Sequence, residues 1–72
     1  MTPALQGLRA VHDCGVIVHR GSEPAHLRAA VEAGYLRYGR RLQDGHWLGQ
    51  YTLKIERARA LNMLRAATRR GA

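Results

Sequence analysis

The feature that most constrains the fold is a hairpin signal in the second half of the chain. Every second residue from position 47 belongs to one side of an alternating strand pattern: Trp47, Gly49, Tyr51 and Leu53. Residues 36–42 form a looser partner of the same kind. Asp44-Gly45 lies between the two runs and is the strongest short-range signal for a tight turn. We therefore expect an antiparallel hairpin over residues 35–54.

A short helix is predicted immediately before the hairpin, over residues 23–33. Ser22 can cap its N-terminus, and Glu23 and Pro24 suit a first helical turn. Gly34 suits the left-handed residue that ends a helix. The buried side of this helix is predicted from apolar residues at helical spacing, which are Leu27, Ala30, Val31 and Gly34.

The N-terminal part of the chain predicts a helix and a short strand. Thr2 as cap and Pro3 at the first helical position begin a helix over residues 3–14, and Gly15 can end it. Residues 16–19 contain a β-branched run that favours a strand, which could join the hairpin as a third member. One face of the helix, which is mostly apolar, carries Ala4, Leu5, Leu8, Val11 and His12.

The C-terminal part predicts a last helix over residues 55–68. Its inner stripe consists of Ile55, Ala58, Leu61, Leu64 and Ala67. We expect the chain to fray from Thr68 onward, which would leave Arg69 and Arg70 on a mobile basic tail. The whole chain, residues 1–72, is thus predicted to be one α+β domain of order α-β-α-β-β-α with a two- to three-stranded antiparallel sheet.

Three segments resemble the winged-helix DNA-binding family: Ala33-Gly34-Tyr35-Leu36, the basic run 37–41, and Tyr51-Thr52-Leu53-Lys54. In that family a recognition helix ends in such a pattern, a basic two-stranded wing follows, and the second wing strand closes before a final helix. The resemblance covers roughly half the chain and implies a small winged-helix-like DNA-binding domain. The family usually has two helices between its first helix and the wing, whereas the interval 15–22 looks too short for the extra one.

Charge favours a polyanionic partner. Twelve Lys and Arg against five Asp and Glu give a formal charge of +7, which points first to nucleic acid and then to an acidic protein surface. The alternative is an ordinary solvated surface in a protein from a GC-rich genome, which encodes Arg in preference to Lys. A chain of 72 residues has a small core, so a homodimer formed through the first or last helix is a further expectation.

The candidate DNA-binding residues fall into two groups. His26 and Arg28 are the polar residues of the predicted recognition helix that could read bases or phosphates. Phosphate contacts are expected from basic residues of the wing and the C-terminus, namely Arg37, Arg40, Arg41, Lys54, Arg69 and Arg70. Cations on an edge strand can instead serve to prevent aggregation.

The aromatic residues of the hairpin allow two interpretations. Trp47 shares a face with Tyr51 and Leu53, which predicts a core position. Alternatively, Trp47 and Tyr38 could anchor a protein partner, and Trp47 could stack on an unpaired base.

The remaining chemistry-bearing residues predict no catalytic or metal site. Cys14 is the single cysteine and is expected to be a small buried hydrophobe in a cytoplasmic protein. His12 and Cys14 lack the paired spacing of a zinc site, and no phosphate-binding glycine loop or separated carboxylate pair is present. We therefore expect a protein that is not an enzyme, has no metal or cofactor, and does not enter a membrane.

Three functions remain as expectations. The first is a small DNA-binding regulator of bacterial or phage origin that contacts duplex phosphates through the wing. The second is a basic protein-binding module, such as a phage inhibitor or an anti-CRISPR-like protein, that docks on an acidic surface of a nucleic-acid-processing complex. The third is an RNA-associated basic protein that binds single strands through Trp47 and the tyrosines.

Overall fold

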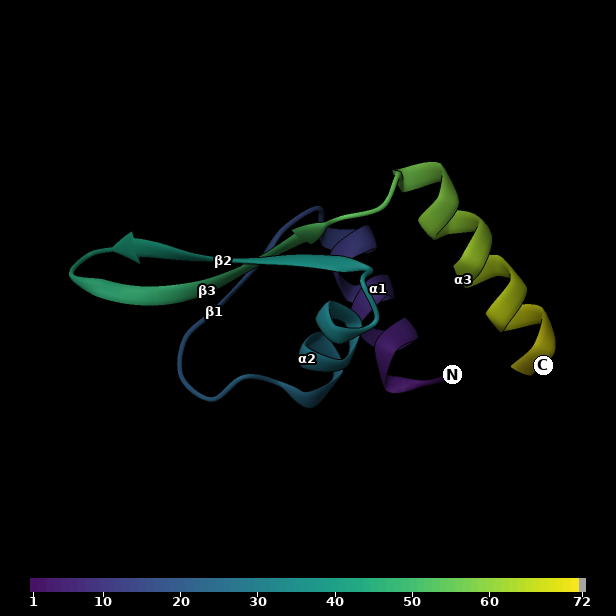
Figure 1. Cartoon of the computed structure of the whole chain (residues 1–72), viewed down its shortest axis with the longest axis horizontal. Helices are drawn as coiled ribbons and strands as arrows, with labels where there is room; N and C mark the ends of the chain where they lie inside the picture. The colour runs from purple at the N-terminus through teal and green to yellow at the C-terminus, as the bar shows by residue number, and fades with distance from the viewer. Residues whose placement is uncertain (72) are drawn as a thin grey trace.

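The computed structural model describes residues 1–71 and confirms the predicted α+β order (Figure 1). The elements are α1 (Pro3–Cys14), β1 (Ile17–His19), α2 (Ala25–Glu32), β2 (Leu36–Gln43), β3 (His46–Leu53) and α3 (Arg57–Gly71). The sheet is antiparallel, with strand order β1-β3-β2. β1 does join the hairpin, because Ile17 pairs with Tyr51 and His19 pairs with Gly49.

The predicted signals of α1 and of the turn are confirmed. The Leu5 amide donates to the side chain of Thr2, which is the N-cap of α1. Gly15 ends the helix at φ 84°, a conformation that glycine adopts without strain. Asp44 and Gly45 both have positive φ, at 51° and 78°, as the favoured two-residue hairpin turn requires.

The start of α2 differs from the prediction. Ser22 does not cap the helix, because α2 begins at Ala25 and the cap position is taken by Pro24, whose ψ of 137° is extended and whose side chain makes no capping bond. The ring of a proline disfavours a helical conformation for the preceding residue, so Glu23 stays outside the helix. Glu23 instead accepts a hydrogen bond from the Tyr51 hydroxyl.

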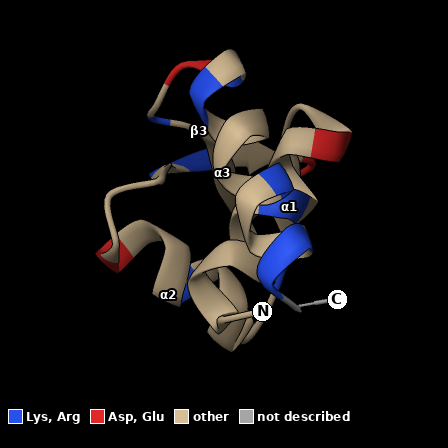
Figure 2. Cartoon of the chain, turned by 90° about the vertical axis from the view of Figure 1, so that its right-hand side faces the viewer, with Lys and Arg blue, Asp and Glu red and all other residues tan. Residues whose placement is uncertain are grey.

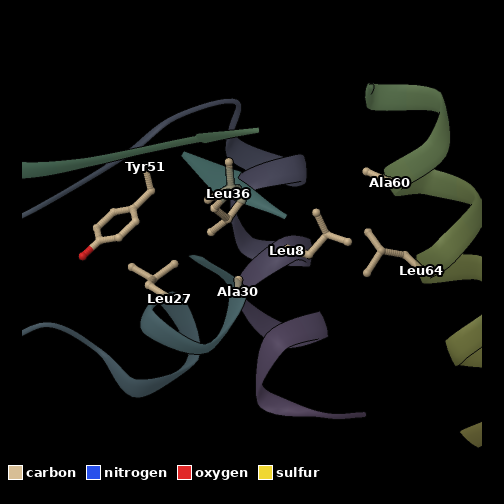
Figure 3. Close-up of a cluster of buried hydrophobic side chains, with 8 residues drawn as sticks. Leu8, Leu27, Ala30, Leu36, Tyr51, Ala60 and Leu64 are labelled. Carbon is tan, nitrogen blue, oxygen red and sulfur yellow. The ribbon is translucent and has the colours of Figure 1, made fainter. Parts of the chain in front are cut away.

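A single core surrounds α1. Its buried side chains come from all three helices and two strands (Figure 3): Leu8, Val11, Leu27, Ala30, Leu36, Tyr51, Ala60 and Leu64. Leu8 points toward Ala60 and Leu64 of α3. α1 and α2 approach closely at Gly7, where a Cβ atom would lie 2.2 Å from the carbonyl oxygen of His26.

α3 begins and ends later than predicted, and the predicted inner stripe is right at Leu64 and wrong at Ala58. It begins at Arg57, so Ile55 precedes the helix, and the side buried on α1 carries Ala60 and Leu64 while Ala58 is exposed. The helix continues to Gly71, so Arg69 and Arg70 belong to its last turn and do not form a frayed tail. Basic residues there interact favourably with the negative end of the helix dipole.

Cys14 is also placed differently, since its side chain is exposed at the end of α1. The last residue of a helix need not be buried, even on the apolar side, when the chain turns away from the core at the next residue. Within residues 1–71, the helices are all too short or too polar to cross a membrane.

Candidate nucleic-acid interface

The most prominent feature of the molecule is the hairpin β2–β3 (residues 36–53), here called the wing. It extends to one side of the helices and contributes to a longest dimension of 43 Å, against 21 and 18 Å for the other two axes (Figure 1). Its strands contain three arginines and no carboxylate, and the turn contributes Asp44. The wing is therefore a projecting and mainly cationic element.

The strand alternation divides the three wing arginines between two faces. Arg37 and Arg41 lie on the face that points away from the helices, which we call the outer face. Arg40 lies on the inner face, the face that carries the buried residues Leu36 and Tyr51 closer to the helices. The arginines thus share a strand, as predicted, but do not form one cluster.

The outer face offers two separate guanidinium groups. Arg37 and Arg41 are exposed, and neither lies within ion-pair distance of a carboxylate of residues 1–71. Four residues along a strand correspond to about 13 Å, so repulsion between the two charges is largely screened in physiological salt. Each can contact its own phosphate. Because β2 is an edge strand, these charges also disfavour pairing with other sheets.

The inner face of the wing tip is aromatic and exposed, which corrects the expectation that Trp47 lies in the core. Trp47 and its cross-strand partner Leu42 are both 58% exposed, whereas Tyr51 is 2% exposed on the same face. Burial on this face therefore ends between Tyr51 and Trp47, and the wing continues beyond the helices (Figure 1). The guanidinium carbon of Arg40 lies 4.9 Å from the centre of the Trp47 ring, a cation–π contact.

The outward side of α2 is not basic. Arg28 donates to Glu32 at 2.9 Å and to Glu23 at 3.2 Å, and these carboxylates raise the pKa of Arg28. The hydrogen bond from the Tyr51 hydroxyl, together with Arg28, holds the pKa of Glu23 below its usual value. Arg28, the one arginine of α2 predicted to contact DNA bases, is therefore bonded to two carboxylates.

The other predicted residues lie apart from this helix surface. His26 is half-buried where α2 packs against Gly7. Lys54 is exposed just after β3, and its backbone amide donates to the Tyr35 carbonyl. Arg69 and Arg70 lie on α3, on the far side of the helices from the wing tip (Figure 1).

Sequence reasoning missed two arginines that the fold brings to Arg69. Arg9 of α1 and Arg65 of α3 line a groove with it, here called the α1–α3 groove. Helical periodicity places Arg65 and Arg69 one turn apart on the same side, but nothing local to either helix indicates that Arg9 faces them.

Within residues 1–71, no three His, Cys, Asp or Glu side chains gather closely enough to hold a metal ion. Comparisons of the chain with protein-family models, curated proteins and solved structures found no match. The likeness to winged-helix domains stays a prediction. The order of elements agrees with it, and the single helix between α1 and the wing departs from it.

Proposed function

We propose that the protein binds double-stranded DNA through the wing, as a small regulator of bacterial or phage type. The observation that carries this proposal is the pair Arg37 and Arg41, exposed and unpaired with any carboxylate of residues 1–71, on a projecting face. Arginine forks bind phosphate oxygens in two-point geometry, and exposed guanidiniums lose little hydration on doing so. The formal charge of +7 adds attraction at longer range.

The α2 surface limits how far this proposal extends. A helix that enters a major groove needs donors toward the bases and must approach phosphates closely. Glu23 and Glu32 oppose that approach, and Arg28 is already bonded to both. We therefore expect the wing to supply most of the binding free energy and sequence preference to be modest.

The experiment measures binding of the protein to a random-sequence duplex pool at near-physiological salt. Fluorescence anisotropy gives the affinity, and sequencing of the bound fraction shows whether a motif is enriched. Arg37→Gln/Arg41→Gln should weaken binding by about ten-fold, because two phosphate contacts are lost. The control Arg20→Gln/Arg59→Gln removes the same charge from exposed positions outside the wing. Equal weakening by both variants would show that only net charge matters and would refute a wing site.

A second candidate, a protein-binding module, rests on the exposed inner face of the wing tip. Tyr38 is 47% exposed, and Leu42 and Trp47 are 58% exposed, so three large side chains form an apolar patch beside Arg40. Aromatic and arginine side chains dominate the energetics of protein interfaces. This function predicts weak DNA binding without an enriched motif. It also predicts that a pull-down from bacterial lysate recovers a protein partner. The Trp47→Ala variant should no longer bind that partner, whereas Arg37→Gln/Arg41→Gln should still bind it.

A further inference from the structure

The α1–α3 groove is a second cationic site, at the end of the molecule away from the wing. It has a volume of about 700 Å³ and lies along the contact between the two helices. Figure 2 looks at this end of the molecule and shows basic positions of α1 and α3 beside one another. The polar side chains lining the groove are Arg9, His12, Asp13, Asn62, Arg65, Thr68 and Arg69.

The charge of the groove is not neutralised from within. Asp13 is the one carboxylate in its lining, and the Nδ1 atom of His12 lies 3.0 Å from it. None of the three arginines lies within 4.0 Å of a carboxylate of residues 1–71. Three guanidiniums on two facing helices therefore surround an open groove, an arrangement that attracts an anion with several oxygens.

The groove is held in shape by contacts between the helices. The Arg9 guanidinium donates to the Thr68 hydroxyl at 3.4 Å, and that hydroxyl donates to the Leu64 carbonyl at 2.9 Å. Near the start of α3, Arg57 donates to the His12 carbonyl at 2.9 Å. Arg9 is thus oriented toward α3 before any ligand arrives, which lowers the entropic cost of binding.

The same charges argue against a second copy of the chain as the occupant. Two such grooves placed face to face would bring six guanidiniums together, with Asp13 of each copy as the only carboxylates of the groove lining. A phosphate backbone has the opposite charge and needs no rearrangement of the groove. Charge complementarity therefore selects a nucleic-acid backbone over self-association.

We propose that the α1–α3 groove binds phosphate groups of nucleic acid and that one protein molecule holds two duplex segments, one at the groove and one at the wing. The bridging part rests on the proposed function of the wing, whereas the groove site stands on its own geometry. The wing and α3 lie on opposite sides of the central helix α1 (Figure 1), so the two segments would be held apart by the body of the protein.

A bridging assay tests this proposal. A biotinylated duplex on beads captures a second, fluorescent duplex only where one protein molecule holds both. The protein concentration is kept below that of the duplexes. Arg65→Gln/Arg69→Gln should reduce capture by about ten-fold while single-duplex binding through the wing falls only a few-fold. Arg20→Gln/Arg59→Gln, which removes equal charge, should capture as the unchanged protein does. Arg9 is kept in both because it bonds to Thr68.

The outcomes separate the two proposals. Unchanged capture by Arg65→Gln/Arg69→Gln overturns the groove site and leaves the wing proposal standing. Unchanged single-duplex binding by Arg37→Gln/Arg41→Gln overturns the wing proposal and with it the bridging of two duplexes, and it leaves the groove site standing. Sedimentation of the protein without DNA gives a third measurement: a dimer that Arg65→Gln/Arg69→Gln dissociates would show the groove to be a self-interface and overturn the inference.

Discussion

The hydroxyl of Tyr51 joins the central strand to the segment between β1 and α2. Its ring is buried in the core, and its O–H donates to Glu23, which also accepts from Arg28. Burial and the adjacent carboxylate raise the pKa of Tyr51, and the hydrogen bond from Tyr51 lowers the pKa of Glu23. One bond thus fixes the ionisation of two groups and positions the entry to α2.

Tyr51→Phe should lower the free energy of unfolding by about 1 kcal/mol at neutral pH. The variant keeps the packed ring and removes the hydrogen bond, and Glu23 is exposed enough to be rehydrated. Urea denaturation followed by circular dichroism measures the change, with Tyr38→Phe as the control because Tyr38 is exposed. An equal loss in both variants would show that the Tyr51 hydroxyl has no special role.

The same bond predicts how stability depends on pH. Since the pKa of Glu23 is lowered from 4.5 on folding, its contribution is present above pH 4.5 and is lost as the pH falls through the lowered value. Since the pKa of Tyr51 is raised from 10.0, its contribution is present below pH 10.0 and is lost as the pH rises further. In Tyr51→Phe both losses should shrink, which denaturation at acid, neutral and alkaline pH would reveal. A pH profile that matches the unchanged protein would contradict this prediction.

At the scale of the elements, the contact between α1 and α2 depends on the absence of a side chain at Gly7. A Cβ atom there would lie 2.2 Å from the His26 carbonyl oxygen and 2.8 Å from the Cβ of Ala30. The first neighbour is backbone, so α2 as a whole would have to move. Gly7 therefore sets the distance between two helices that supply half of the core.

Gly7→Ala should destabilise the fold by about 1–3 kcal/mol, because overpacking outweighs the gain of about 1 kcal/mol in helix propensity. Gly39→Ala is the matched control, since a Cβ at position 39 of β2 would meet nothing within 4 Å. Thermal unfolding compares the two variants. Equal melting temperatures would mean that α2 shifts at no cost, contrary to this prediction.

The sequence predicted the type of each element because the signals are local. Thr2, Gly15 and Asp44-Gly45 act on the residues beside them, and strand alternation assigns Trp47 and Tyr51 to one face. Local patterns do not say how far a neighbouring helix extends over that face. The predicted core position of Trp47 was therefore wrong, because no helix of residues 1–71 covers the wing tip. For the same reason they did not predict that Ala60, and not Ala58, faces α1.

At the scale of the whole molecule, the arginines of the wing and those of the α1–α3 groove lie at opposite ends, with the core around α1 between them (Figure 1). Binding through exposed arginines releases counterions from DNA, so affinity should fall steeply with salt. Arg37→Gln/Arg41→Gln should reduce the slope of log affinity against log salt by about 2, one for each lost phosphate contact. Titrations at several salt concentrations measure the slope. An unchanged slope would show that these arginines do not contact phosphate.

The exposed position of Trp47 gives the chain a built-in optical probe. It is the only tryptophan, it lies at the wing tip away from the core, and it is 58% exposed beside Leu42 and the Arg40 guanidinium. Its emission should therefore change little when the core unfolds, because the ring is already solvated in the folded state. The same emission should respond directly when a ligand covers the wing. Intrinsic fluorescence would thus report ligand binding at the wing, whereas unfolding would be measured by the helical circular-dichroism signal.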